Sequence, residues 1–240
     1  MDPLVDRLIE LAFEEDLGAT GDLTTKATVP AGTRAEAQVR AKEPLVLAGV
    51  AVFCRVFELL DPAVRVEVLS HDGTQVAPGT VVLRAAGAAH SLLVGERPAL
   101  NFLMRLSGIA TQAAHIAAVV RGSGARVVDT RKTTPGWRAL EKAAVRAGGC
   151  ASHRMGLFDG ILIKDNHIEA AGGITAAVAR ARDQAHHLIK IEVEAASQAQ
   201  VGECLALGVE AILLDNMDDA ALATAVRTVR AHERHSGHKV

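Results

Sequence analysis

The residues best suited to chemistry are cationic side chains that follow short apolar runs. They lie in Asp129–Trp137, Ser152–Arg154 and Ile161–His167. Residues 121–164 contain nine Lys or Arg against three Asp or Glu, a local balance of +6 in a chain whose formal charge is −2. Positive charge that is gathered into one cleft attracts anions and raises their local concentration. This segment therefore predicts a site for a small, highly charged anion.

Short β-branched runs alternate with helical patterns through the second part of the chain. The predicted strands are Arg126–Asp129, Gly160–Lys164, Leu188–Glu194 and Ala211–Asp215, and the predicted helices are Trp137–Ala147, Thr175–Ala185, Ser197–Leu207 and Asp218–Glu233. Repeated βα units at this spacing predict a parallel sheet, either open or closed as a barrel. In both arrangements, ligands bind at the carboxyl ends of the strands. We therefore expect one site to gather the polar residues that end or follow the strands: Arg131, Lys132, Lys164, Asp165, Asn166, Glu192, Glu194, Asp215 and Asn216.

One predicted strand carries charge on a single face. Because side chains alternate along a strand, Lys190, Glu192 and Glu194 share one face, and the apolar residues between them pack on helices. Unpaired charge inside a barrel would be very costly. The pattern therefore predicts ion pairs with Lys132 or Lys164, or a bound metal ion.

The first part of the chain has other patterns. Asp2–Asp16 has the apolar period of a helix, and Ala35–Lys42 alternates as a half-buried antiparallel strand does. Glu96–Val120 predicts a long helix or a helix pair with a bend near residues 107 and 108. Further strands are predicted at Val64–Val68 and Val81–Arg84. We predict an N-terminal α+β sandwich with a linking helix over residues 1–105, and an open α/β barrel, incomplete at its C-terminus, over residues 106–240.

The composition excludes several classes of protein. Aromatic residues make up only 2% of the chain and the net charge is near neutral, which argues against nucleic-acid binding by base stacking or by a basic surface. The chain opens without an apolar signal segment, and its apolar runs are far shorter than the ~20 residues of a membrane helix. Three widely spaced cysteines suit free thiols in a reducing compartment. We expect a cytoplasmic protein with no membrane or nucleic-acid partner.

Nine motifs in order, at compatible spacing, resemble those of the quinolinate phosphoribosyltransferase family, also called carboxylating nicotinate-nucleotide pyrophosphorylases. The similarity runs along nearly the whole chain, and nine motifs together are far more specific than any one of them. The motifs are Glu15–Gly18, Gly21–Thr24, Glu96–Asn101, Leu106–Thr111, Asp129–Gly136, Gly148–Arg154, Ile163–His167, Glu192–Glu194 and Leu214–Asn216.

The resemblance implies a reaction, a cofactor and an assembly. The family joins quinolinate to 5-phosphoribosyl-1-pyrophosphate and releases pyrophosphate and CO2, which gives nicotinate mononucleotide for NAD synthesis. It requires Mg2+ and works as a homodimer in which the partner completes each site. A hexameric assembly is left open as an alternative. By motif, Arg97 would reach quinolinate from the neighbouring subunit. Arg131, His153 and Arg154 would line the same pocket, Lys132 and Lys164 would contact phosphate, pyrophosphate or carboxylate groups, and Glu194 and Asp215 would hold the ribose hydroxyls and Mg2+.

The chemistry of the side chains fits these roles. Quinolinate is a planar dianion, and Arg pairs bidentately with a carboxylate. Mg2+ prefers hard oxygen ligands and typically bridges one or two carboxylates to substrate phosphates. Structural alternatives also stay open. His153 could be a packed imidazole, Arg97 a surface partner of Glu96, and Glu192 purely structural, while residues 165–167 could cap the next helix.

The end of the chain departs from the family. Family members continue with a strand that ends in Ser-Gly-Gly, another strand and a Gly-rich loop, which bind the 5′-phosphate of the ribose, whereas this sequence ends at His235–Val240. We therefore expect a truncated chain with weak activity. Two alternatives accompany the leading hypothesis: a related phosphoribosyltransferase with another acceptor, such as nicotinate, and a noncatalytic anion-binding subunit. The set Arg97, Arg131, His153 and Arg154 favours a dicarboxylate acceptor.

Overall fold

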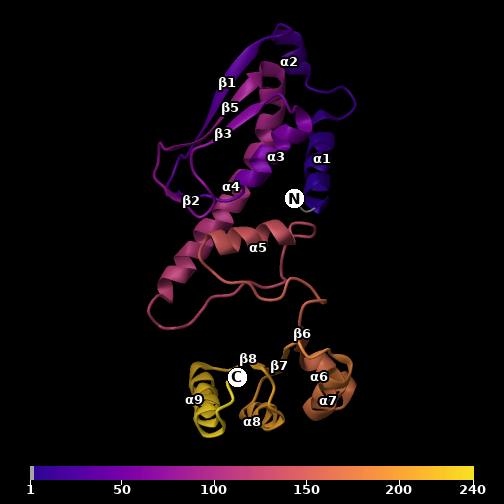
Figure 1. Ribbon diagram of the computed structural model, residues 1–240, viewed down its shortest axis with the longest axis vertical. Coiled ribbons are helices and arrows are strands. Elements are labelled where there is room, and N and C mark those ends of the chain that lie inside the picture. Colours follow the sequence, from indigo (N-terminus) through magenta and orange to yellow (C-terminus); the bar gives the residue numbers. More distant parts are fainter. Residues whose placement is uncertain (1–2) are drawn as a thin grey trace. The chain divides into compact units, whose positions relative to one another are not determined.

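The computed structural model describes residues 3–240, so Asp2, the first residue of the predicted helix Asp2–Asp16, lies outside the described residues. The chain forms two compact units, one ending at His153 and the other beginning at Arg154 (Figure 1). Helix α4 (Ala89–Val119) runs without a break through the predicted domain boundary at residues 105 and 106, and that boundary stays a prediction. Within residues 3–240, no helix combines the length and the apolar character needed to cross a membrane.

The first unit combines helices with small antiparallel sheets. Its helices are α1 (Pro3–Leu17), α2 (Leu23–Thr28), α3 (Val50–Leu60), α4 and α5 (Arg138–Ala147). Its strands are β1 (Arg34–Arg40), β2 (Leu45–Val46), β3 (Arg65–Val68), β4 (Gln75–Val76) and β5 (Val81–Ala88). β5 lies between β1 and β3 in an antiparallel sheet, and β2 pairs with β4. These elements confirm the predicted α+β class.

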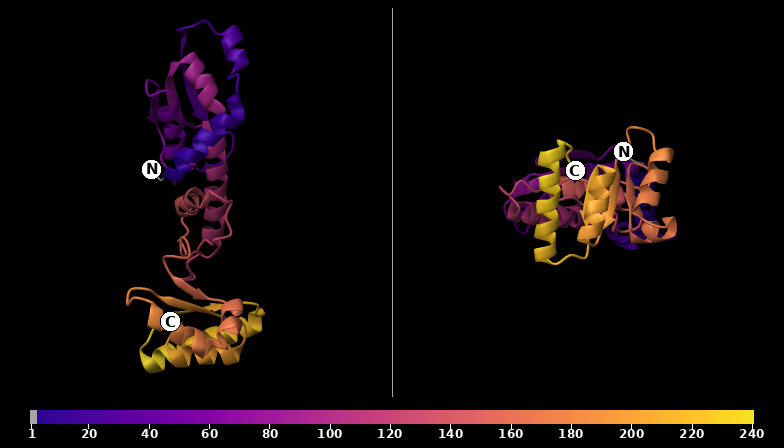
Figure 2. Two further views of the ribbon diagram at one scale, coloured as in Figure 1. Left: turned by 90° about the vertical axis from the view of Figure 1, so that its right-hand side faces the viewer. Right: turned by 90° about the horizontal axis from the view of Figure 1, so that it is seen from below.

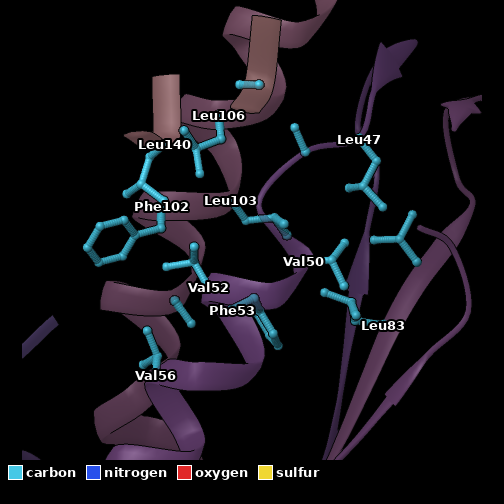
Figure 3. Close-up of a cluster of buried hydrophobic side chains, with 14 of the residues drawn as sticks. Leu47, Val50, Val52, Phe53, Val56, Leu83, Phe102, Leu103, Leu106 and Leu140 are labelled. Carbon is cyan, nitrogen blue, oxygen red and sulfur yellow. The ribbon is translucent and has the colours of Figure 1, made fainter. Parts of the chain in front are cut away.

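The core of this unit lies where α3 and α4 pack together and against the sheet (Figure 3). Phe53, Leu83 and Leu106 are buried there. The two helices approach closely at Gly95, because a Cβ atom at this position would lie 2.5 Å from Cε1 of Phe57. A core of aliphatic side chains and several phenylalanines thus places the long α4 against the sheet.

Several details of the first unit differ from the predictions. β1 is antiparallel as expected, but it is exposed apart from Val39, because it lies at the sheet edge and its inward side chains are mostly small alanines. The predicted helix or helix pair at Glu96–Val120 is the single helix α4, which begins seven residues earlier. The predicted strand Arg126–Asp129 is only an isolated parallel bridge between Val128 and Ala151, because the apolar run is two residues long and Val128 is exposed.

The second unit is a parallel α/β layer. Its strands are β6 (Ile161–Ile163), β7 (Ile191–Ala195) and β8 (Ala211–Leu214), in the order β6-β7-β8. Its helices are α6 (Asp165–Ala171), α7 (Ile174–Gln184), α8 (Gln198–Leu207) and α9 (Asp219–Ser236). α7, α8 and α9 lie on one side of the sheet (Figure 2). The parallel strands and alternating helices are those predicted from the sequence, apart from the short α6.

Capping side chains begin two of these helices where the sequence predicts. The hydroxyl of Ser197 accepts a hydrogen bond from the backbone N–H of Gln200 at the start of α8. The carboxylate of Asp218 accepts one from the N–H of Ala221 at the start of α9. Such caps satisfy backbone donors that the first turn of a helix leaves unpaired.

Candidate functional site

The sheet of the second unit separates apolar from charged side chains. Ile191 and Val193 of β7 are buried at 3% and 0% exposure in the cluster formed with α7 and α8. Glu192 lies opposite Leu162 of β6, so it shares a sheet face with Lys164, two residues beyond Leu162. The charged face predicted for β7 is therefore the face turned away from the helices.

Glu194 and Asp215 extend this charged face. Glu194 lies opposite Leu213 of β8, and Asp215 follows two residues later, so the two carboxylates belong to the same side of the sheet. The Nζ atom of Lys164 lies 3.6 Å from Oε2 of Glu194, which confirms the predicted ion pair with Lys164. Glu194 is only 9% exposed, whereas Lys164 is exposed. The structure therefore brings these three predicted site residues together at the carboxyl edge of the sheet.

The backbone after β8 is held in an unusual conformation. Asn216 has φ of +52°, the left-handed region that few residues other than glycine adopt. Its side-chain amide donates to Oδ2 of Asp215 at 2.8 Å, and the N–H of Asp215 donates to the carbonyl of Ala195 at 3.1 Å. These contacts orient the Asp215 carboxylate at the end of the strand.

The two carboxylates fit the ligand habits of Mg2+. Both are hard oxygen donors on neighbouring strand ends, and Mg2+ commonly takes one or two protein carboxylates and completes its shell with water and substrate phosphates. No group of three or more Asp, Glu, His or Cys residues that could hold a metal occurs within residues 3–240. Glu194 and Asp215 are therefore the residues of this sheet edge that could hold such an ion.

The side chains of Asp165 and His167 bind the backbone at the start of the next helix, which is the capping role that the alternative interpretation gave to residues 165–167. Nδ1 of His167 accepts a hydrogen bond from the backbone N–H of Lys164 at 2.9 Å, and Oδ1 of Asp165 accepts one from the N–H of Asn166 at 2.7 Å. These bonds form the first turn of α6, and that turn fixes the backbone from which the Lys164 side chain leaves.

In the first unit, residues 129–137 form the cationic loop that carries Arg131 and Lys132. Arg131 is half-buried, and its Nε atom is buried without a hydrogen-bond partner among residues 3–240. Lys132 is exposed, and its backbone N–H donates to Oγ1 of Thr130 at 3.1 Å. A buried donor without a partner is rare in folded proteins and indicates a group that awaits a ligand or water.

Side chains of helices α4 and α5 bind the C-terminal half of the cationic loop, at Thr134 and Trp137. Nη2 of Arg105 donates to Oγ1 of Thr134 at 2.8 Å and to Oε1 of Glu141 at 2.9 Å, and its guanidinium lies 5.5 Å from the centre of the Trp137 ring. Oε2 of Glu141 accepts from the N–H of Thr134 at 3.2 Å. Burial raises the pKa of Glu141, but the hydrogen bonds from Thr134 and Arg105 outweigh it, so this pKa lies below its ordinary value.

A buried ion pair holds Asp129, the first residue of the cationic loop. Nζ of Lys142 contacts Oδ1 of Asp129, and the two side chains are 1% and 6% exposed. The N–H of His153 donates to the same Oδ1 at 2.8 Å, and Nζ of Lys142 donates to the carbonyl of His153 at 3.2 Å. His153, half-buried, is thus fixed through its backbone, while its imidazole remains a candidate for the anion site.

Arg154 begins the second unit. Its Nη1 donates to the carbonyl of Gly160 at 3.0 Å, and its Nε, like that of Arg131, is buried without a hydrogen-bond partner within residues 3–240. It lines an open depression of about 330 Å³ beside β6, together with Ile163, His167 and Arg180. The side chain therefore keeps donor capacity for an anion.

Arg97 differs from the other predicted site residues. It is exposed on α4, and among residues 3–240 its guanidinium forms no hydrogen bond or ion pair. The surface pair with Glu96, which the sequence left open, is therefore absent among the described residues. Its exposure leaves it available to another molecule.

Sequence reasoning missed four residues that support the site: Arg105, Asp129, Glu141 and Lys142. Lysine and glutamate in a helix normally face solvent, so nothing in the pattern of α5 indicates that Lys142 is buried. The only sequence signal for Asp129, Glu141 and Lys142 was their place inside or beside the cationic loop, and Arg105 had no such signal.

Comparisons with known proteins agree with these observations. The family model for the quinolinate phosphoribosyl transferase N-terminal domain matches residues 22–107, and the model for the C-terminal domain of the same family matches residues 109–238. The chain is 44% identical over 227 residues to a probable carboxylating nicotinate-nucleotide pyrophosphorylase of Synechocystis, across 95% of this chain and 76% of that protein. A Bacillus subtilis protein of the same name is 44% identical over 210 residues, across 88% and 72%.

A solved structure gives the same result. The crystal structure of NadC from Streptococcus pyogenes matches with a TM-score of 0.90 and 40% identity, across 95% of this chain and 80% of that one. Together with the family models, this match confirms the predicted fold, an N-terminal α+β sandwich followed by an open α/β barrel.

Proposed function

The chain belongs to the quinolinate phosphoribosyltransferase family, and from this premise we propose that it transfers the phosphoribosyl group of 5-phosphoribosyl-1-pyrophosphate to quinolinate. The 2-carboxylate leaves as CO2, and the products are nicotinate mononucleotide and pyrophosphate, a step of de novo NAD synthesis. The alternatives of another acceptor or a noncatalytic role gain no support from the comparisons.

One observation supports a dicarboxylate acceptor above all. Within residues 3–240, three buried side-chain nitrogen or oxygen atoms lack a hydrogen-bond partner, and two of them are the Nε atoms of Arg131 and Arg154. Leaving a buried donor unpaired costs about 1–3 kcal/mol, and more when the group is charged. A carboxylate that accepts from such a guanidinium removes this cost and gains a charge-assisted hydrogen bond. By the family motifs, Arg131, His153 and Arg154 would bind the carboxylates of quinolinate.

Lys132 and Lys164 would bind phosphate, pyrophosphate or carboxylate groups, and Glu194 and Asp215 would bind the ribose hydroxyls and Mg2+. When bound, Mg2+ would neutralise charge on the pyrophosphate leaving group. The ammonium of Lys164 lies 3.6 Å from Glu194, so the opposite charges of these two side chains attract each other before any ligand arrives. The carboxylates can then stabilise the positive charge that develops on the ribose ring.

The reaction requires no nucleophilic side chain. The bond from ribose C1 to pyrophosphate breaks, and the pyridine nitrogen of quinolinate forms the new bond to C1. The ring is then cationic, so it accepts the electron pair that remains when the 2-carboxylate leaves as CO2, and C2 takes a proton. The protein mainly positions charged reactants and neutralises their charge.

The proposed assembly is a homodimer with a shared site. Arg97 is exposed, and among the described residues its side chain has no partner in its own chain, so it would reach quinolinate bound by a second copy. A hexamer stays an alternative, and the cytoplasmic location stays a prediction.

Titration of the protein with quinolinate, followed by analysis of the products formed with 5-phosphoribosyl-1-pyrophosphate and MgCl2, tests the function. We expect quinolinate to bind and nicotinate mononucleotide to form. Binding of nicotinate instead would indicate another acceptor, and binding without product would indicate a noncatalytic subunit.

The pocket is tested by Arg131→Ala. Loss of one charge-assisted pair of about 1.5–3 kcal/mol weakens quinolinate binding by roughly 10- to 150-fold. Arg121→Ala is the matched control, since it removes one exposed arginine from the same cationic segment. Equal quinolinate affinity in Arg131→Ala and wild type would refute the assignment of Arg131.

A further inference from the structure

The buried pair Asp129–Lys142 holds together two backbone segments that no helix or sheet fixes. Residues 127–129 run beside residues 151–153, joined by the bridge between Val128 and Ala151. The N–H of Ala151 donates to the carbonyl of Val127 at 2.8 Å, and the N–H of Asp129 donates to the carbonyl of Ala151 at 3.2 Å. This single bridge supports the two segments only weakly. One of them leads into Arg131 and the other ends at His153, and both are predicted site residues.

The ion pair supplies two further contacts to these segments, both at the backbone of His153. Oδ1 of Asp129 accepts from the N–H of His153, and Nζ of Lys142 donates to the carbonyl of the same residue, so both backbone groups of His153 are bound to one ion pair. Lys142 belongs to α5, which packs on α4. The pair therefore connects the last residue of each segment, Asp129 and His153, to helix α5.

The geometry of the pair favours positioning over stability as its role. Its side chains are almost fully buried, so both charges have lost their hydration. Oδ2 of Asp129 is buried and has no hydrogen-bond partner within residues 3–240. A buried ion pair with an unsatisfied oxygen is poor at stabilising a fold, and apolar residues of similar volume often replace such pairs without loss of stability.

We propose that Asp129 and Lys142 are positioning residues for quinolinate recognition, an inference that rests on the proposed function. The pair fixes the backbone of His153 directly. It also fixes the start of the cationic loop, two residues before Arg131. Neither residue needs to touch the substrate, since the pair acts through the side chains of Arg131 and His153.

The test is the double variant Asp129→Asn/Lys142→Met. It removes one negative and one positive charge, so the net charge near the anion site is unchanged. The amide introduced by Asp129→Asn could still accept from the N–H of His153 because it has a carbonyl oxygen, but the carbonyl of His153 loses its donor. We expect a folded protein whose Kd for quinolinate rises about tenfold or more, since small misplacements and lost outer contacts have effects of this size.

The binding of 5-phosphoribosyl-1-pyrophosphate with MgCl2 supplies the internal reference. Its Kd is expected to rise less than that of quinolinate, because Lys132 is the one member of the cationic loop among the side chains proposed to bind this donor, and Lys164, Glu194 and Asp215 lie outside the loop. Arg146→Met is the matched control. It also replaces a cation of α5 by Met, one turn further on, where the exposed guanidinium contacts Oγ of Ser152 at 3.3 Å. Its quinolinate affinity should equal that of wild type.

Each outcome decides one question. Equal quinolinate affinity in the folded double variant and wild type would overturn the positioning role while leaving the proposed function intact. An equal loss in Arg146→Met would overturn it too, since any change on α5 would then suffice. A wild-type protein that fails to bind quinolinate would overturn both. If the double variant does not fold, Asp129→Asn/Lys142→Gln is the second variant, since it removes both charges and keeps hydrogen-bonding groups at both positions. About a threefold weaker quinolinate affinity is then the expected result, and an unchanged affinity would overturn the positioning role.

Discussion

Glu194→Gln separates a ligand-binding role of this carboxylate from a structural one. The substitution keeps the shape of the side chain and removes its charge. The carboxylate is 9% exposed, so the charge is held at a desolvation cost, and its Lys164 partner lies 3.6 Å away with a side chain that is 47% exposed. Solvent screens a pair of this kind, and such pairs contribute about 1 kcal/mol or less.

The ion pair and the desolvation of the Glu194 charge have opposite effects on the free energy of unfolding. Loss of the ion pair destabilises the folded protein, and loss of a buried charge stabilises it. We therefore expect the free energy of unfolding to change by less than about 1 kcal/mol in either direction. Urea denaturation at pH 7 measures this quantity.

The effect on ligand binding should be much larger. If Glu194 binds the ribose hydroxyls and Mg2+, its charge contributes about 1.5–3 kcal/mol per charge-assisted hydrogen bond, so the Kd of 5-phosphoribosyl-1-pyrophosphate with MgCl2 should rise about 10- to 150-fold. Titration calorimetry measures this Kd. Glu169→Gln is the matched control, because it removes an exposed carboxylate from α6 of the same unit.

Two results would refute the reasoning. One is an unchanged Kd for the phosphoribosyl donor in Glu194→Gln. The other is a loss of stability so large that unfolding accounts for the weaker binding. A repeat without MgCl2 adds a further check, since the difference between wild type and variant should shrink when no metal ion is present to be bound.

Two further predictions concern the support of the site and the core. Glu141→Gln should lower the free energy of unfolding by about 1–2 kcal/mol at pH 7. The pKa of Glu141 is lowered in the folded protein, so the stability that its charge contributes is complete above the ordinary pKa of 4.5 and is lost as the pH falls through the lowered pKa. The urea denaturation curves of variant and wild type should therefore converge in acid. Gly95→Ala should destabilise the protein by about 1–3 kcal/mol, since the new Cβ would lie 2.5 Å from Phe57, whereas Gly202→Ala in α8, with nothing within 4 Å, should stabilise it by about 0.5–1 kcal/mol. Melting temperatures that rank these two alanine variants the other way would contradict the packing argument.

The parallel unit could be predicted well because its signals are local. The apolar residues of β7 alternate with charged ones, so period two alone assigns Val193 to the core and Glu194 to the other face. The predicted starts of α8 and α9, at Ser197 and Asp218, coincide with the residues that cap these helices. The ends of strands then identify Lys164, Glu194 and Asp215 as neighbours before any coordinates are known.

The support of the cationic loop could not be predicted because it depends on contacts between distant residues. Lys142 lies in a helix whose pattern suggests an exposed lysine, and only the fold shows that Asp129 neutralises it. The isolated bridge at Val128 is another such case, since its two apolar residues look like a strand and the chain provides one pairing partner, Ala151. Sequence patterns identify the side chains that bind, whereas tertiary contacts determine what holds them.

The same division explains how one strand serves both stability and chemistry. In β7, Val193 is fully buried against the helices, and the next residue, Glu194, presents a carboxylate on the opposite face. Because the backbone between them is fixed by β6 and β8 on both sides, burial of the valine restricts the position of the carboxylate. The apolar face of the strand therefore contributes to binding without touching a ligand, since it lowers the entropy that the carboxylate would lose when a ligand binds.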